Sequence, residues 1–260
     1  MPTYALLGAT GATGSAILRY LLEEPLQDLR LNILVRNKAK LLNQFPALES
    51  STTFILNIVE GTPDDGISLR SALKDAAAVF MCIATNESRP NQTLAQDTTK
   101  SIINALKQLQ TENGPGYVKP TVLMLRTASL NETFAAQAGW EKTMAHFCLH
   151  YVYEDLELAC KQLESTAKED AELLDYIFVD PPSIHDADGT TRTGHELTVD
   201  KNPKPTLMYA DLGAGFCEIA QRRNEFKGKG VGVSATGKVI ETWGVLLGYL
   251  GLGLKSRVIG

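Results

Sequence analysis

The chain has 260 residues, of which 44% are hydrophobic and 21% are charged, and its formal net charge at pH 7 is −5. This composition excludes a disordered chain and gives no basic stripe for nucleic acid, and the length predicts one domain spanning residues 1–260. The four cysteines form no Cys-x-x-Cys pair and no secretory signal pattern begins the sequence, so we expect free thiols and a cytoplasmic protein.

The N-terminal residues predict a dinucleotide-binding unit. The apolar run Tyr4–Leu7 leads into three glycines spaced as Gly-x-x-Gly-x-x-Gly, and a helical pattern follows. Glycine permits the tight turn after the strand, and the free N–H groups of the next helix attract a diphosphate. The strand before and the helix after make this motif more specific than glycine spacing alone. The expected contacts are Gly8, Thr10, Gly11, Ala12, Thr13 and Gly14.

The second predicted strand, Leu31–Val35, indicates which dinucleotide is bound. A cofactor with a free ribose 2′-hydroxyl calls for Asp or Glu at the end of this strand, but this chain has Arg36, followed by Lys38 and Lys40. A guanidinium and ammonium groups suit a 2′-phosphate, so we predict NADP(H) rather than NAD(H). The alternative is that these residues are simply the solvated start of a helix.

Further along the chain, short apolar runs alternate with helical patterns. The predicted strands are Thr53–Val59, Ala77–Ala84, Thr121–Leu125, Tyr176–Val179 and Gly230–Ser234, and the predicted helices are Gly14–Leu22, Ser68–Ala72, Gln92–Gln110, Trp140–Gln162 and Ala210–Arg222. This alternation predicts an α/β Rossmann fold, a single doubly wound parallel sheet with helices on both faces. Ligands bind at the carboxyl ends of such strands, so further cofactor contacts are expected at Glu60, Ala84, Thr85 and Pro181.

Two segments near the C-terminus are candidates to cover a substrate. Residues 183–208 are polar, rich in turn formers and without strong periodicity, and they follow the sixth predicted strand. In the segment 240–260, the apolar run Trp243–Leu254 is broken by glycines and is shorter than the ~18 to 20 residues of a membrane span. We therefore expect no membrane span, and instead a buried segment, a small substrate-covering region or a contact in a homo-oligomer.

Several motifs together resemble the atypical short-chain dehydrogenase/reductases of the NmrA-like and biliverdin-reductase-B-like type. They are the glycine motif, Arg36, the sequences Cys82–Thr85, Arg126–Ser129 and Asp155–Leu163, and Asp175–Pro182, so the resemblance covers nearly the whole chain. Ala95–Thr98 and Tyr153–Glu157 also resemble fungal secondary-metabolite enzymes. These include reductases of aflatoxin-type pathways and the reductase/Diels–Alderases of paraherquamide and malbrancheamide alkaloids. The resemblance implies an NADP(H)-dependent oxidoreductase.

The chain departs from the family at the catalytic residues. Standard members donate a proton from a Tyr whose pKa, about 10 in water, is lowered by a Lys four residues later. None of the eight tyrosines has such a Lys, and Arg126 and Thr127 stand where the family implies a Ser. Arg126 can orient a substrate but cannot donate a proton at neutral pH, and Asp155 could pair with it. These two are the expected catalytic residues; the alternative is a purely structural ion pair.

A site without a proton donor favours a substrate that needs only a hydride. We therefore expect an iminium or activated C=C in a large, mostly apolar natural product, and the alkaloid resemblance implies an intramolecular Diels–Alder cyclisation as an added step. The alternatives are a reductase of an aromatic polyketide intermediate, a cyclase with a structural dinucleotide, and a non-catalytic NADP(H) redox sensor. His146 and His150 have metal-ligand spacing but apolar neighbours, so no metal is expected.

Overall fold

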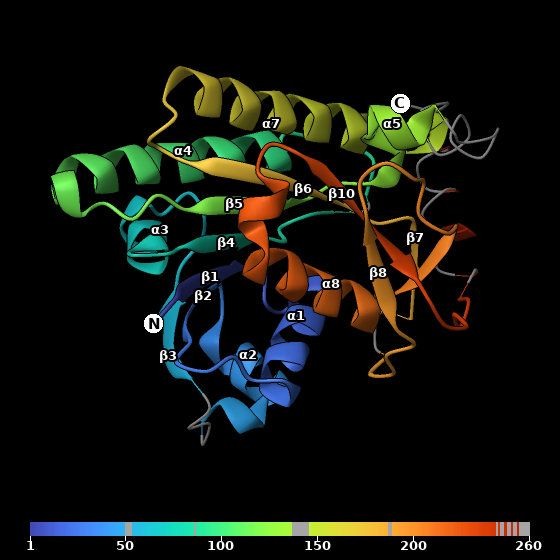
Figure 1. Cartoon of the computed structure of the whole chain (residues 1–260), viewed down its shortest axis with the longest axis horizontal. Helices are drawn as coiled ribbons and strands as arrows, with labels where there is room; N and C mark the ends of the chain where they lie inside the picture. Colours follow the sequence, from blue (N-terminus) through green and yellow to red (C-terminus); the bar gives the residue numbers. More distant parts are fainter. Residues whose placement is uncertain are drawn as a thin grey trace.

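The main sheet has eight strands in the order β3-β2-β1-β4-β5-β6-β10-β8 (Figure 1). The computed structural model describes residues 1–49, 54–85, 87–136, 146–186 and 189–242, together with residues 244, 247, 248, 251 and 254. All neighbouring strands in the main sheet are parallel except β8, which runs antiparallel to β10. The strands are β1 (Thr3–Leu7), β2 (Arg30–Val35), β3 (Ile55–Glu60), β4 (Ala78–Met81), β5 (Thr121–Leu125), β6 (Asp175–Asp180), β8 (His195–Thr198) and β10 (Gly230–Ala235).

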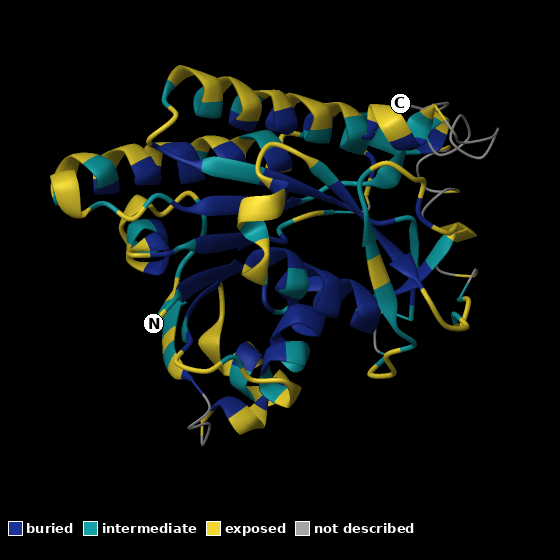
Figure 2. Cartoon of the chain, viewed as in Figure 1, coloured by how far each residue is buried: buried dark blue, intermediate teal, exposed yellow. Residues whose placement is uncertain are grey.

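Helices cover both faces of this sheet, which confirms the doubly wound fold. One face packs against α1 (Ala12–Glu23), α2 (Lys38–Gln44) and α8 (Tyr209–Gln221), and the other against α3 (Gly66–Leu73), α4 (Leu94–Asn113) and α7 (His150–Glu169). Successive strand residues enter opposite cores, as Leu6 and Leu7 of β1 do. Figure 2 shows the strands buried between helices that expose their outer faces. Because both faces of these strands are buried, their sequences are continuous apolar runs.

The glycine turn after β1 is dictated by close backbone packing. Gly8 has φ +92°, and an added Cβ there would lie 2.7 Å from the Cys82 carbonyl oxygen. A Cβ on Gly14 would lie 2.1 Å from the Gly8 carbonyl oxygen. Both positions therefore require glycine, because the turn lies almost in contact with the residue that follows β4, and α1 starts almost in contact with the turn.

The predicted substrate cover at residues 183–208 is more ordered than its sequence suggested. It contains β7 (Ser183–His185) and β9 (Thr206–Met208), which form a separate two-stranded parallel sheet, and β8, which extends the main sheet. Each of these strands has only three or four residues, too few for a periodic pattern to stand out among turn formers. The prediction that this segment covers a substrate remains a prediction.

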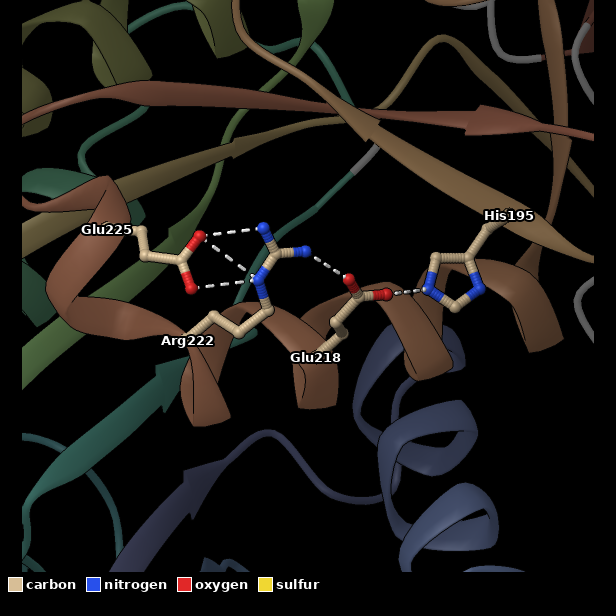
Figure 3. A network of polar contacts seen from close by, with 4 residues as sticks. All are labelled: His195, Glu218, Arg222 and Glu225. Atoms are coloured by element: carbon tan, nitrogen blue, oxygen red, sulfur yellow. Dashed lines mark hydrogen bonds and ion pairs between the residues drawn. The ribbon is translucent and has the colours of Figure 1, made fainter.

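Side-chain networks attach this segment to the helices. Figure 3 shows His195 of β8 bound through Nε2 to Glu218 of α8 at 3.0 Å, and Glu218 paired in turn with Arg222. Arg222 also pairs with Glu225 of α9 (Arg223–Phe226). The buried Asp211 carboxylate accepts hydrogen bonds from the chain just before β8, at residues 193 and 194. The segment is thus packed onto the α8 face of the sheet.

Other boundaries differ from the predictions in detail. The strand predicted as Ala77–Ala84 ends at Met81, and α2 begins at Lys38, where the start of a helix was expected only as the alternative to a 2′-phosphate site. The helix predicted to start at Trp140 falls partly on residues 137–145, which lie outside the described residues, and α7 continues to Glu169. It continues because buried Leu163 and partly buried Ala167 extend its apolar face beyond the predicted end.

Most of the predicted C-terminal lid lies outside the described residues. Of its described residues, Leu247 is 62% exposed and Leu254 is 44% exposed, so these two side chains are not buried. In the part of the chain that the structure describes, no helix is both long and apolar enough to cross a membrane. The four cysteines are buried free thiols, as predicted.

Candidate functional site

The N-terminus of α1 offers free backbone donors to a phosphate. Gly11 precedes the helix without a side-chain cap, no acidic residue lies in the first turn, and the first intrahelical bond runs from the Ser15 N–H to the Gly11 carbonyl at 2.8 Å. The N–H groups of Ala12, Thr13 and Gly14 precede that bond and have no partner within the helix. Gly11 is exposed. The geometry fits a dinucleotide diphosphate, which would lie against these groups.

The predicted NADP(H)-selecting residues lie together at the ends of β2 and β3. Arg36 follows β2 directly, is exposed, and makes no ion pair within the described residues. Lys38 begins α2, and its N–H donates to the Glu60 carboxylate at 3.3 Å. Glu60 therefore helps to fix the start of α2, while the Arg36 guanidinium remains available for a 2′-phosphate.

The remaining predicted cofactor residues lie at the same edge of the sheet. Ala84 and Thr85 follow β4, and the Thr85 hydroxyl accepts the Glu87 N–H at 3.1 Å. Pro181 follows β6, and its carbonyl accepts the Ala128 N–H at 2.9 Å. Carboxyl ends of parallel strands meet at one edge, so these residues share it with the glycine turn. Their contact with the cofactor remains a prediction.

Arg126 does not pair with Asp155, contrary to expectation. Its Nε and Nη2 bind the two carboxylate oxygens of Asp180, at the end of β6, at 2.7 and 2.6 Å. Asn131 Nδ2 also donates to Asp180, and the Arg126 guanidinium lies over the Phe178 ring. Burial alone would lower the pKa of Arg126, but Asp180 raises it above its ordinary value. The guanidinium thus joins the ends of β5 and β6 in a bidentate pair with little exposed surface.

Asp155 is engaged with the start of α4. Its carboxylate is 3% exposed and accepts the backbone N–H groups of Ala95 at 2.8 Å and Gln96 at 3.0 Å. The Gln96 side-chain amide donates to it as well. Thr93 precedes α4 without capping it through its own side chain, so Asp155 provides the cap from another helix. Its negative charge also suits the positive end of the α4 dipole.

A hydroxyl cluster lies where α7 approaches the residues that follow β5. Tyr153, in the first turn of α7, hydrogen-bonds through its phenol with the side chains of Ser129 and Thr127. Burial raises the pKa of Tyr153 above its ordinary value, although these hydrogen bonds act to lower it. The phenol therefore keeps its proton at neutral pH and can donate it. His146 contacts the same cluster, with its Nε2 3.1 Å from the Ser129 carbonyl oxygen.

This cluster was not predicted from the sequence. The serine after β5 was expected to be replaced, whereas Ser129 is present in the short turn Ala128–Leu130 and meets Tyr153. No tyrosine was expected to be catalytic, because no lysine follows any of them at the required spacing, and exposed Glu157 occupies that place on α7. The available signal was that Tyr153 lies in the predicted helix, two residues before Asp155; in the structure it lies in the first turn of α7, which packs alongside α4 (Figure 1).

The two histidines with metal-ligand spacing have other partners. His146 binds the Ser129 carbonyl, and His150 Nε2 lies 3.7 Å from the Glu154 carboxylate. Within the described ranges, no group of three or more His, Cys, Asp or Glu side chains is arranged to hold a metal ion.

Comparisons with known proteins agree with this geometry. Residues 8–213 match a family described as NAD(P)H-binding. The chain is 49% identical to averufin oxidase A of Dothistroma septosporum, over 99% of this chain and 92% of that protein. It is 45% identical to an averufin oxidase of Emericella nidulans (96% and 88%), and 35% identical to an oxidoreductase of Aspergillus novofumigatus (84% and 78%).

A solved structure has the same fold. A short-chain dehydrogenase/reductase of Veillonella parvula, determined in complex with NADP, superposes with a TM-score of 0.64. Its sequence is 16% identical, and the match covers 91% of this chain and 95% of that one.

Proposed function

Because the chain belongs to the NAD(P)H-binding family and is homologous to fungal averufin oxidases, we propose that it is an NADP(H)-dependent oxidoreductase of fungal secondary metabolism. Its proposed substrate is an aromatic polyketide of the averufin kind. The single observation that carries a catalytic role, rather than cofactor binding alone, is the buried Tyr153 phenol beside Ser129 and Thr127, with His146 in contact with both the Tyr153 ring and the Ser129 backbone.

The roles of the residues follow from their chemistry. The dinucleotide, when bound, supplies or accepts a hydride. Tyr153 holds a proton at its phenol oxygen and gives it to a substrate oxygen that becomes a hydroxyl. Ser129 and Thr127 fix the direction of the phenol and can hydrogen-bond the same substrate oxygen. The site suits the interconversion of a carbonyl and an alcohol, because that reaction moves a proton to or from oxygen.

The proposed substrate is thus the aromatic polyketide, which the sequence offered as an alternative, and not the iminium. The iminium prediction depended on a site that lacked a proton donor and contained an Arg126–Asp155 pair. In the structure, Arg126 binds Asp180 and Asp155 caps α4, and the buried Tyr153 phenol is our proposed proton donor. The named relatives also point to averufin and give no support for a Diels–Alder step.

The direct test is to incubate the purified protein with averufin and either NADPH or NADP⁺. We expect a change in absorbance at 340 nm together with a product whose mass differs by two hydrogens. Tight NADPH binding without turnover of averufin or related polycyclic ketones would instead support the redox-sensor alternative. A cyclised product of unchanged mass would support the cyclase alternative.

Cofactor preference provides a second test, at Arg36. Replacing Arg36 by Ala removes a guanidinium proposed to bind the 2′-phosphate, and a charged hydrogen bond of this type contributes about 1.5–3 kcal/mol. The dissociation constant for NADPH should therefore rise roughly 10- to 100-fold, with that for NADH almost unchanged. Titration by calorimetry measures both, and Lys100→Ala, an exposed lysine on α4, is the matched control. Equal weakening of both cofactors would contradict the assignment.

A further inference from the structure

The hydroxyl cluster is assembled from two separate segments of the chain. Thr127 and Ser129 lie in the turn after β5, whereas Tyr153 lies on α7, more than twenty residues later. The phenol meets both hydroxyls only if α7 and this turn are held in register. A lysine on α7 would help to orient the site in standard family members, but position 157 carries an exposed glutamate.

His146 contacts both segments. Its ring packs edge-to-face against the Tyr153 ring, with 4.9 Å between centroids and an interplanar angle of 79°. Its Nε2 lies 3.1 Å from the Ser129 carbonyl oxygen. A carbonyl oxygen can only accept, so Nε2 carries a hydrogen and donates it. One side chain thus fixes the ring of the proton donor and the backbone of its partner.

The turn that carries Ser129 has its own local support. The Ala128 N–H donates to the Pro181 carbonyl at 2.9 Å and the Leu130 N–H to the Thr127 carbonyl at 3.0 Å, and the Thr127 side chain accepts the Ser129 N–H at 3.4 Å. The Tyr153 N–H is used within the helical turn, where it donates to the Leu149 carbonyl at 2.9 Å. The contacts of His146 therefore join two elements that local hydrogen bonds orient separately.

We propose that His146 is a positioning residue that holds the Tyr153 phenol against Ser129 and Thr127. This inference rests on the proposed function, because it assigns to His146 a role in aligning the proton donor of that reaction. The ring contact fixes the side-chain torsion angles of Tyr153, and the Nε2 hydrogen bond fixes the position of the Ser129 backbone relative to α7. Losing the hydrogen bond should leave the phenol intact but misaligned with its hydroxyl partners.

Three substitutions separate the two contacts. His146→Phe keeps an aromatic ring and removes the N–H donor, His146→Gln keeps an N–H donor and removes the ring, and His146→Ala removes both. For turnover of averufin with NADP(H), we expect kcat to fall about 10-fold in His146→Phe and further in His146→Ala, from the loss of one aligning hydrogen bond. His146→Gln should recover part of the rate, while KM and the dissociation constant for NADPH stay within about 3-fold.

A second readout does not depend on turnover. The hydrogen bonds to Ser129 and Thr127 lower the phenol pKa, so misalignment should raise it further. The ionisation of Tyr153 can be isolated as the difference in phenolate absorbance between each His146 variant and the same variant carrying Tyr153→Phe. We expect its midpoint to move upward by about half a pH unit or more in His146→Phe, and less in His146→Gln.

His150→Phe is the matched control. His150 begins α7 and pairs with Glu154 on the solvent side, so its loss should leave kcat and the titration unchanged. If Tyr153→Phe is inactive but His146→Phe behaves as the unsubstituted protein in both readouts, the role of His146 is overturned and the proposed function stands. If Tyr153→Phe is fully active, the proposed function itself fails. A loss in His150→Phe equal to that in His146→Phe would also overturn the positioning role.

Discussion

Replacing Tyr153 by Phe is expected to lower kcat for turnover of averufin roughly 10²- to 10⁴-fold, the usual contribution of a positioned general acid. The substitution removes one oxygen, keeps the ring and its contact with His146, and leaves untouched the glycine turn that we expect to bind the diphosphate. The dissociation constant for NADPH and the thermal unfolding midpoint should therefore change little. Steady-state kinetics and calorimetric titration measure the two quantities separately.

Tyr151→Phe is the control for this prediction. Tyr151 lies two residues earlier on α7, is partly buried, and packs against the His150 ring rather than against the hydroxyl cluster. Its phenol should not contribute to the rate. Equal losses in the two variants, or full activity of Tyr153→Phe, would remove Tyr153 from the mechanism.

The raised pKa of Tyr153 also favours reduction over oxidation at neutral pH and makes the oxidative rate depend on pH. Burial favours the protonated phenol, so at neutral pH the residue is ready to donate a proton, as reduction requires. Oxidation requires the phenolate as acceptor, and no lysine at position 157 helps to form it. The oxidative rate should therefore rise with pH throughout the range up to and beyond the ordinary phenol pKa, about 10. A pH profile recorded in both directions tests this asymmetry.

Replacing Asp155 by Ala is expected to destabilise the protein rather than to abolish chemistry directly. The substitution leaves the N–H groups of Ala95 and Gln96 and the Gln96 amide without their acceptor in a buried place. Loss of this cap should cost about 3 kcal/mol of the free energy of unfolding. For a chain of this size the unfolding midpoint should fall by roughly 6–12 °C, which scanning calorimetry measures.

Asp155→Asn distinguishes the structural role from a catalytic one. The amide keeps one oxygen to accept an N–H of α4, but its NH2 group cannot accept the other N–H and the charge that suits the helix dipole is lost, so about 2 kcal/mol should be lost. Well below its unfolding midpoint, this variant should turn over averufin at a rate within a few-fold of the unsubstituted protein. A stable Asp155→Asn variant with kcat reduced more than about 100-fold would restore Asp155 to the catalytic residues.

The residues expected to bind the cofactor could be placed from the sequence, because most of them depend on contacts between sequence neighbours. Gly14 packs against the Gly8 backbone within one turn, and Arg36 follows its strand directly, so spacing alone places these residues. The contact of Gly8 with the Cys82 backbone, by contrast, depends on the pairing of β1 with β4. Likewise, continuous apolar runs predicted the buried parallel strands, since both faces of each strand are covered. The short strands β7, β8 and β9 were not predicted, because three or four residues are too few to show a periodic pattern.

The proposed catalytic half depends on contacts between distant segments, which only the tertiary structure decides. Asp155 was the expected partner of Arg126, but the pairing of β5 with β6 brings Asp180 to Arg126, and the packing of α7 on α4 directs Asp155 to the start of α4. The same packing brings Tyr153 to Ser129. The sequence by itself determined a Rossmann fold with a dinucleotide turn, because local sterics and burial specify both. The tertiary structure decided which polar groups meet, because charge and hydroxyl chemistry do not reveal which distant segment folds beside them.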